Sequence, residues 1–298
     1  MTYAMKRRAG LVLVLLALYA ILSIENYGQQ RAEVFVQLGH SNLVKAAAFS
    51  PDGRYVLSGG YDNSLRLWDF SSGREIRAFA GHTLPVCAAA FTADGRSMLS
   101  GSFDNTIKIW NISSGAEVGS LTVSQRGTSD IAFSPDGKYA LVATRDGTLE
   151  LWSIYNKIKL RTFAEKVGYI ASLLFSPDGR YALSGGGGKR DRDFTVKLWA
   201  VPDGTLIRTF SGHTETVSSV AFSPDSRYAL SGSNDRTCML WDIATGQRMR
   251  TFTNHLSGIT SVAISPNGRY ALSASLEPLS TMMAPPPMPN RPARMPVA

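Results

Sequence analysis

The chain has 298 residues, of which 44% are hydrophobic and 18% are charged, a composition that suits a packed core and excludes a largely disordered chain. The net charge of +8 is concentrated at the two ends, and residues 31–277 hold 26 basic and 22 acidic side chains. This near balance argues against a nucleic-acid-binding protein. Only two cysteines are present, Cys87 and Cys238, which excludes a disulfide-framed mini-domain and a cysteine zinc cluster.

Residues 1–30 have the composition of a targeting segment. The basic stretch MTYAMKRR precedes an apolar run of 16 residues, Ala9–Ile24. Such a run is short for a spanning helix, which needs roughly 20 residues, and long for a signal-peptide core of about 7–15. The positive flank predicts that the amino terminus stays inside and that the rest of the chain is exported. We therefore expect a hydrophobic helix that is either a signal peptide or a membrane anchor, and cleavage remains open.

A repeat organises the remaining chain. The five tryptophans are 42, 42, 47 and 42 residues apart, and lie at Trp68, Trp110, Trp152, Trp199 and Trp241. In the first repeat, VKAAAF, RYVLSG and SLRLWD alternate with the turns SPDG and YDN, and SSGREIRAFAGH follows. Proline fixes φ and glycine tolerates the left-handed region in such turns. Each repeat is therefore predicted to hold four short strands, a pattern typical of a propeller.

The recurring GH, SPDG, SGSxD and WD residues resemble the WD-repeat family, over residues 34–284. The resemblance implies an all-β fold, a β-propeller of six blades, with residues 31–284 as the propeller domain. Glu33–His40 has the character of an outer strand and is expected to complete the last blade, which would close the ring and remove an open sheet edge.

The sixth repeat is incomplete. It begins at Asn254-His255, but the position of its tryptophan falls on Met283, and Pro278 precedes the poor strand candidate Leu279–Met283. Residues 285–298 are rich in proline, which lacks the amide donor of a sheet, and we expect a disordered or polyproline tail. Both an evolved tail and a truncated or frame-shifted gene are compatible with this change of composition.

All four histidines occupy one position of the repeat. The family resemblance implies a buried structural network of this His with a Ser, an Asp and the Trp. The full sets are His40, Ser58, Asp62 and Trp68; His82, Ser100, Asp104 and Trp110; and His213, Ser231, Asp235 and Trp241. Ser, His and Asp together raise the question of a hydrolase, but a catalytic triad should occur once and open onto a cleft. We therefore expect no catalytic residue, no metal, no cofactor, and two free buried thiols.

Positions that vary between repeats are the candidates for partner binding. The residue before the turn aspartate is Tyr61, Phe103, Arg145, Arg192 or Asn234. Repeats three and four have Ser124 and Lys166 in place of His, which is expected to leave Asp146 and Asp193 without that partner. Repeat four also carries a five-residue insertion. The remaining candidates, which we expect to form a basic sector beside Tyr61 and Phe103, are Arg126, Lys166, Tyr169, Lys189 and Arg190.

These observations favour a non-catalytic protein-interaction scaffold, exported or held at a bacterial-type membrane by the amino-terminal helix, with the propeller on the extracytoplasmic side. Arginine-rich loops favour carboxylates, so a protein partner with an acidic segment is expected, and neither nucleic acid nor a small-molecule substrate is. The alternatives are an exported hydrolase or lyase that uses the central channel, a binder of an anionic polymer, and a degenerate gene product.

Overall fold

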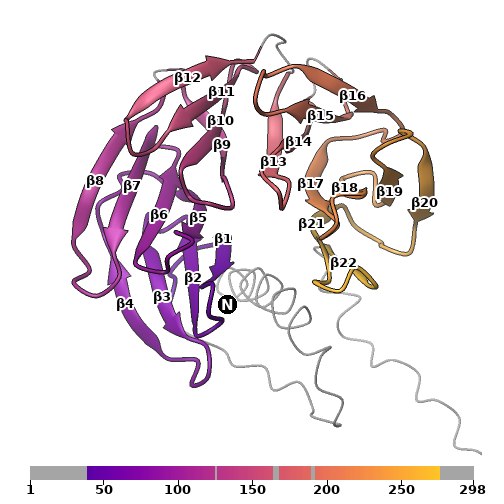
Figure 1. Cartoon of the computed structure of the whole chain (residues 1–298). Helices are drawn as coiled ribbons and strands as arrows, with labels where there is room; N and C mark the ends of the chain where they lie inside the picture. Colours follow the sequence, from indigo (N-terminus) through magenta and orange to yellow (C-terminus); the bar gives the residue numbers. More distant parts are fainter. Residues whose placement is uncertain (1–38, 125, 164–167, 189–191, 276–298) are drawn as a thin grey trace, which may run out of the picture.

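The computed structural model describes residues 39–124, 126–163, 168–188 and 192–275. Every regular element in these ranges is a β-strand, in agreement with the predicted all-β fold. The strands form five four-stranded antiparallel sheets and one two-stranded sheet, each built from consecutive strands. Figure 1 shows the six sheets following one another around a central axis, as expected for a propeller.

Each predicted strand of repeats one to five is present. Sheets one to five consist of β1 (Val44–Phe49), β2 (Tyr55–Gly60), β3 (Leu65–Asp69) and β4 (Glu75–Phe79); β5 (Val86–Phe91), β6 (Ser97–Ser102), β7 (Thr106–Asn111) and β8 (Glu117–Thr122); β9 (Thr128–Phe133), β10 (Tyr139–Thr144), β11 (Leu149–Ser153) and β12 (Ile158–Thr162); β13 (Ile170–Phe175), β14 (Tyr181–Gly186), β15 (Val196–Ala200) and β16 (Leu206–Phe210); and β17 (Val217–Phe222), β18 (Tyr228–Ser233), β19 (Cys238–Asp242) and β20 (Arg248–Phe252). The first strand of each sheet is the innermost one (Figure 1).

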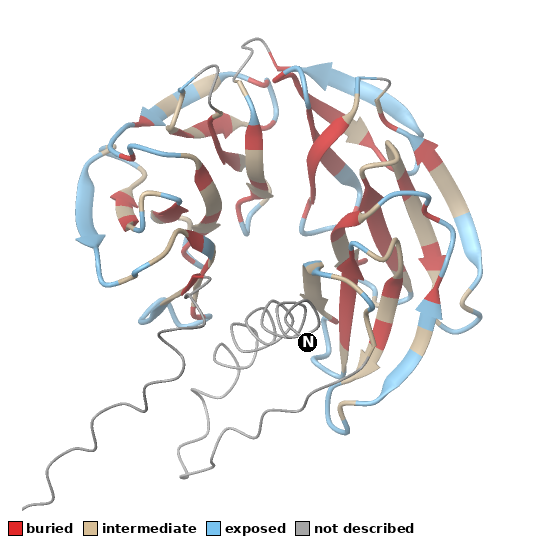
Figure 2. Cartoon of the chain, turned by 180° about the vertical axis from the view of Figure 1, so that it is seen from behind, coloured by how far each residue is buried: buried red, intermediate tan, exposed pale blue. Residues whose placement is uncertain are grey.

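The hydrophobic core is divided among the seams between neighbouring sheets. Five clusters of buried side chains lie between consecutive sheets, from the first pair to the fifth and sixth. The seam between sheets three and four, for example, contains Leu141, Leu149, Ile170 and Trp199. Figure 2 shows that burial is greatest on the inner and middle strands and that the outermost strands face solvent. Each sheet is therefore stabilised mainly by the sheets on either side of it.

The sixth sheet contains β21 (Ile259–Ile264) and β22 (Ala271–Ser275) within the described residues. The strand expected at Leu279–Met283, the proline-rich tail, residues 1–30 and most of the expected closing strand Glu33–His40 lie outside the described ranges. Closure of the ring by residues 33–40 therefore stays a prediction. In Figure 1, β1 and β21 lie on the two sides of the interval between the first and sixth sheets.

Within the residues that the structure describes, no helix has the length and apolar character needed to cross a bilayer.

Candidate functional site

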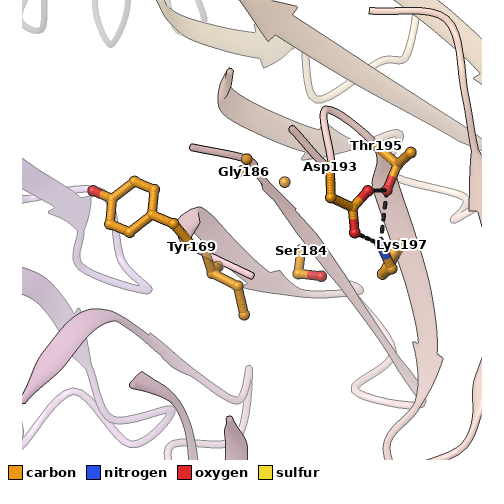
Figure 3. Close-up of a pocket in the computed structure, with 9 residues that line it drawn as sticks. Tyr169, Ser184, Gly186, Asp193, Thr195 and Lys197 are labelled. Carbon is orange, nitrogen blue, oxygen red and sulfur yellow. Dashed lines mark hydrogen bonds and ion pairs between the residues drawn. The ribbon is translucent and has the colours of Figure 1, made fainter. Parts of the chain in front are cut away.

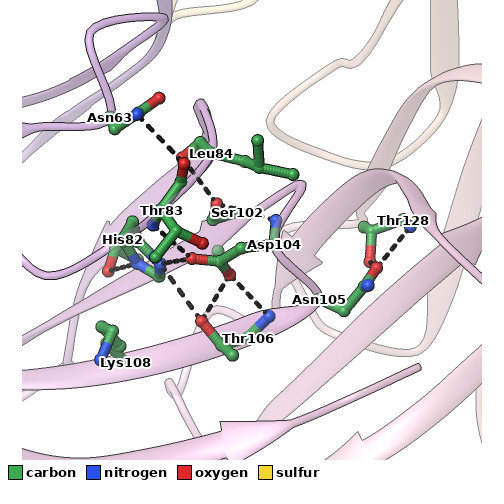
Figure 4. A network of polar contacts seen from close by, with 12 residues as sticks. Asn63, His82, Thr83, Leu84, Ser102, Asp104, Asn105, Thr106, Lys108 and Thr128 are labelled. Atoms are coloured by element: carbon green, nitrogen blue, oxygen red, sulfur yellow. Dashed lines mark hydrogen bonds and ion pairs between the residues drawn. The ribbon is translucent and has the colours of Figure 1, made fainter. Parts of the chain in front are cut away.

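The predicted His–Ser–Asp–Trp network is present in the second sheet, and Figure 4 shows its His82 and Asp104 with the surrounding polar contacts. His82 Nδ1 lies 2.9 Å from Asp104 Oδ2, and His82 Nε2 lies 2.7 Å from Ser100 Oγ. Trp110 Nε1–H donates to the same Ser100 Oγ at 2.8 Å. Because Ser100 accepts from the indole, its own O–H is directed to His82 Nε2, and the opposite nitrogen, Nδ1, carries the proton that Asp104 accepts.

The same arrangement recurs in the first and fifth sheets. His40 lies 2.9 Å from Asp62 and 2.8 Å from Ser58, whose Oγ accepts from Trp68 at 2.7 Å. In the fifth sheet, each of the corresponding contacts among His213, Asp235, Ser231 and Trp241 is 2.8 Å long. In each of these three sheets the histidine thus contacts both the serine and the aspartate, and the tryptophan donates to the same serine.

Burial sets the charge state of these networks. Removal of the imidazole from water lowers the pKa of His82 and outweighs the opposing effect of Asp104, and His213 behaves in the same way. Burial alone would raise the pKa of Asp104, but hydrogen bonds from Thr106, the Thr83 amide and His82 outweigh it, so the pKa is lowered. At neutral pH the network therefore pairs a carboxylate with a neutral imidazole.

The glycine before each histidine is required by the tryptophan. A Cβ at Gly81 or Gly212 would lie 3.1 Å from the indole of Trp110 or Trp241, and one at Gly39 would overlap the indole of Trp68. The two residues of the GH pair therefore serve the same tryptophan. The glycine leaves space for the indole, and the histidine belongs to the hydrogen-bond network that includes the indole. In the sixth repeat, where no tryptophan occurs at the matching position, Asn254 replaces this glycine.

In sheet three, different side chains bind the tryptophan indole and the turn aspartate. Val142 replaces the serine, and Trp152 Nε1–H donates instead to Glu150 at 3.0 Å, which also pairs with Lys159 at 3.1 Å. Asp146 has other partners in place of the histidine, because Thr144 donates to it at 2.6 Å and Arg126 donates to it at 2.8 Å. These bonds, together with those of Thr148, lower the pKa of Asp146.

Sheet four places a lysine beside the turn aspartate, so Asp193 also has a partner in place of the histidine. Lys197 Nζ donates to Asp193 at 2.5 Å and to Thr195 at 2.8 Å, while Trp199 donates to Ser184 at 2.9 Å. A small pocket lies beside this group and is lined by Ser184, Asp193, Thr195 and Lys197, among others (Figure 3). It adjoins the place that the imidazole occupies in the intact repeats. Lys166, at the histidine position of the sequence, lies outside the described residues.

The histidine of the sixth sheet contacts two serines. His255 Nε2 lies 2.7 Å from Ser273 Oγ, as in the intact repeats, and Nδ1 lies 2.9 Å from Ser275 Oγ.

These networks cannot act as hydrolase triads in this conformation. Ser100 is completely buried between its imidazole and its indole, so no substrate carbonyl can reach its Oγ. Each of the three sets provides hydrogen-bond partners for buried polar groups. Burial of such a group without a partner would cost about 1–3 kcal/mol. Among the described residues, no group of three or more His, Cys, Asp or Glu side chains is placed to hold a metal ion. Cys87, on β5, and Cys238, on β19, are buried and free.

The candidate partner-binding residues that the structure describes lie in loops at one end of the central axis, which we call the mouth face. Two loops of each repeat meet there, the loop before the innermost strand and the loop after the second strand. In each of sheets one to five, a backbone N–H of the second loop donates to a carbonyl of the first. These donor–acceptor pairs are Tyr61–Leu43, Phe103–Pro85, Arg145–Gly127, Gly187–Tyr169 and Asn234–Thr216.

The series of five donor–acceptor pairs corrects the sequence alignment of repeat four. The insertion moves Arg192 away from the ring position, which Gly187 takes, and the Arg192 amide instead bonds to Gly188 at 3.0 Å. Tyr169 remains on the face, and its side chain points away from the Asp193–Lys197 pair (Figure 3). Lys189 and Arg190 lie outside the described residues, as Lys166 does.

Aromatic and aliphatic side chains gather over sheets one and two on the mouth face. The rings of Tyr61 and Phe103 meet edge to face with centroids 6.2 Å apart, and Tyr61 is 39% exposed. Leu43 and Leu84, which were not among the predicted residues, are 44% and 46% exposed in the adjacent loops. Leu43 and Leu84 both lie between the repeat histidine and the first strand, and this shared position could have identified them from the sequence. Arg145 and Asn234 are exposed farther around the ring.

Comparison with known proteins agrees with this architecture. Segments of the chain match the "Small ribosomal subunit protein RACK1" of Drosophila melanogaster (40% identity over 52 residues, 17% of this chain and 15% of that protein) and of Dictyostelium discoideum (49% over 39 residues, 13% and 12%). Another segment matches "Ribosome assembly protein 4" of Saccharomyces cerevisiae, with 54% identity over 41 residues, 14% of this chain and 8% of that protein. The matches thus span a small part of each relative.

The family comparison covers most of the chain. The model described as "WD domain, G-beta repeat" matches six consecutive segments, residues 32–69, 73–111, 115–153, 158–200, 204–242 and 246–277. From the second segment onward, each begins with the outermost strand of one sheet and continues into the inner strands of the next. The buried His–Ser–Asp–Trp networks link positions within single segments. The chain therefore belongs to the WD-repeat family.

Proposed function

We propose that this protein is a non-catalytic scaffold that binds a protein partner on the mouth face over sheets one to three. The observation that carries the proposal is the contact between the exposed Tyr61 and the half-buried Phe103, which joins two sheets and adjoins the exposed Leu43 and Leu84. Aromatic side chains clustered on a rigid support are frequent anchors of protein interfaces. The backbone bonds of Tyr61 and Phe103 to the neighbouring loops restrict their movement, which lowers the entropy that binding would cost.

The partner is expected to present an acidic group beside an apolar one. Arg145 follows Phe103 around the ring, and among the described residues its exposed guanidinium has no ion pair. The neighbouring Arg126, by contrast, is paired with Asp146. A free guanidinium next to an aromatic surface suits a carboxylate carried by a segment that also has an apolar side chain.

Residues 1–30 support the further proposal that the scaffold is exported and either released or kept at the membrane, with its mouth face on the extracytoplasmic side. The basic flank followed by Ala9–Ile24 carries this part. Labelling of intact cells with a membrane-impermeant amine reagent tests it, because an exported propeller is modified and a propeller that stays inside is not.

The test of partner binding is affinity capture by the full chain from solubilised cells of its source, read by mass spectrometry. Wild type is compared with Tyr61→Ala/Phe103→Ala and with Arg145→Glu. Tyr155→Ala, in a turn outside the mouth face, is the matched control because Tyr155 is also exposed. A partner that the control retains and both mouth-face variants lose supports the proposal. Equal recovery by all folded variants overturns it.

A further inference from the structure

The turn between the first and second strands holds an aspartate in each of sheets one to five. In the fifth sheet, the Ser223 hydroxyl and the Arg227 N–H both donate to Asp225, at 2.6 and 3.1 Å. These bonds lower the pKa of Asp225, so the folded turn favours the carboxylate. The aspartates that accept the same pair of bonds in sheets one to four are Asp52, Asp94, Asp136 and Asp178.

The sixth sheet has an asparagine at this position. Asn267 Oδ1 accepts from the Ser265 hydroxyl at 2.8 Å and from the Arg269 N–H at 3.0 Å. Gly268 follows, with a φ of 69° in the left-handed region. Both bonds use a single side-chain oxygen, which a carboxylate also provides. The turn can therefore hold an aspartate at position 267 without any change in its hydrogen bonds.

The pair Asn267-Gly268 allows an intramolecular reaction of the side-chain amide. The backbone nitrogen of Gly268, which no Cβ shields, bonds to Asn267 Cγ, while Nδ2 leaves as ammonia with the proton of the glycine N–H. The resulting succinimide ring takes up one water. Opening at Cγ gives aspartate with the original backbone, and opening at the main-chain carbonyl gives isoaspartate, whose peptide bond runs through Cγ. One water is consumed, one ammonia is released, and nothing is oxidised or reduced.

The end of the β21–β22 hairpin that carries this turn is exposed. Tyr270 is 48% exposed, and Ala271, the first residue of β22, is exposed as well. The residues that match Ala271 in sheets one to five are all buried, and they are Val56, Met98, Ala140, Ala182 and Ala229. The reaction requires release of the Gly268 N–H, which donates to the Ser265 carbonyl at 2.8 Å. Because few buried contacts hold this end, local opening should release that N–H readily.

We propose that Asn267 is a deamidation site, which converts spontaneously to aspartate and isoaspartate in the folded protein. The aspartate product gives the sixth sheet the turn of the other five. It also adds a negative charge at the end of the axis opposite the mouth face, where the innermost strands end. The isoaspartate product inserts one methylene into the main chain, which displaces the acceptor oxygen and weakens the hairpin. The two products therefore have opposite effects on the sixth sheet.

The experiment is prolonged incubation of the full chain in mildly alkaline buffer, followed by digestion with trypsin and mass spectrometry. Trypsin releases residues 251–269 as one peptide, which contains both Asn267 and Asn254. Asn254 is also exposed but precedes His255, so it is an internal control within the same peptide. Electron-transfer fragmentation locates the new acid and distinguishes aspartate from isoaspartate. A parallel sample in urea reports conversion in the unfolded chain.

The fifth sheet supplies the matched control variant, Gly268→Ser. Ser226 holds the glycine position there, with a φ of 57°, and its N–H donates to the Ser223 carbonyl at 2.9 Å. A serine therefore supports this turn, while its side chain hinders the attack on the amide carbon. A melting curve establishes that Gly268→Ser is folded like wild type. The variant Asn267→Asp represents the aspartate product.

We expect conversion at Asn267 to exceed that at Asn254, and Gly268→Ser to convert to less than half the extent of wild type. Asn267→Asp should melt at or above the temperature of wild type, and the fraction that contains isoaspartate should melt below it. Conversion in urea with none in the folded protein would overturn the site, because the turn would then protect the amide. Equal conversion of Asn254 would also overturn it. A lower melting temperature of Asn267→Asp would overturn the inference that the turn accepts the product.

Discussion

The carboxylate of Asp130 accepts a hydrogen bond from the backbone N–H of Leu173 at 2.9 Å, across the seam between sheets three and four. Serine provides this acceptor in the next two sheets. Asp130 is an acid at a site that needs only an acceptor, and its burial raises its pKa to about 6, although Lys45 and the amides of Leu173 and Ile131 oppose that shift. The fold therefore tolerates this charge at a cost in stability.

Replacement of Asp130 by asparagine is expected to stabilise the protein at neutral pH. The folded-state pKa of about 6 lies above the unfolded value, so wild type loses stability as pH rises from about 4 to about 6. A shift of roughly two units corresponds to about 3 kcal/mol, which sets an upper limit on the gain. Urea unfolding at pH 4.5 and 7.5 checks this, and Asp136→Asn, at an exposed turn, is the control. A variant with the same pH dependence as wild type would contradict the prediction.

Ser100→Ala is expected to destabilise the second sheet by about 1–3 kcal/mol. The substitution removes the hydroxyl between His82 and Trp110 and leaves a buried imidazole nitrogen and a buried indole N–H without partners. Thermal and urea unfolding measure the loss, and the exposed Ser113→Ala should change stability by less than about 0.5 kcal/mol. Equal stability of Ser100→Ala and wild type would show that the network contributes nothing.

Lys197→Met is expected to destabilise sheet four, and Lys166→His in the same chain is expected to reverse much of the loss. Lys197 donates to Asp193 in sheet four, whereas the fifth sheet has Met239 at this position together with an imidazole. The double variant therefore reproduces the combination of the fifth sheet.

The melting temperatures of the single and double variants measure this exchange. Lys108→Met, at the same position of the second sheet, is the control and should have a small effect, because Lys108 pairs with a partly exposed Glu117. A double variant less stable than Lys197→Met alone would contradict the inference that Lys197 takes the role of the imidazole.

The two thiols are expected to be unreactive in the folded protein. Burial raises the pKa of Cys87 well above its ordinary value and raises that of Cys238 as well, so little thiolate forms at pH 8. Iodoacetamide should modify neither cysteine without denaturant and both in 8 M urea. Rapid modification of Cys87 in native protein would show that its seam opens readily.

Local sequence patterns could predict each strand of the five complete sheets and the three intact polar networks. The strands follow from a period of about 42 residues with turns at fixed offsets, and the networks connect residues 10 to 22 positions apart within one repeat. Because such contacts recur in each copy, one repeat predicts the next. The Tyr61–Phe103 pair could also be predicted from the sequence, since these residues occupy the same position in adjacent repeats.

Other features depend on contacts between repeats or on rearranged side chains, which a repeat alignment does not contain. The positions of the strands and of their polar networks follow from the repeat pattern, because those contacts are local to each unit of about 42 residues. The three-dimensional arrangement was needed to find that Asp130 bridges two sheets, that Lys197 contacts Asp193 in sheet four, and that Gly187 takes the place expected for Arg192. These outcomes depend on which buried polar groups meet across a seam or a lengthened loop, and burial requires each of them to find a partner.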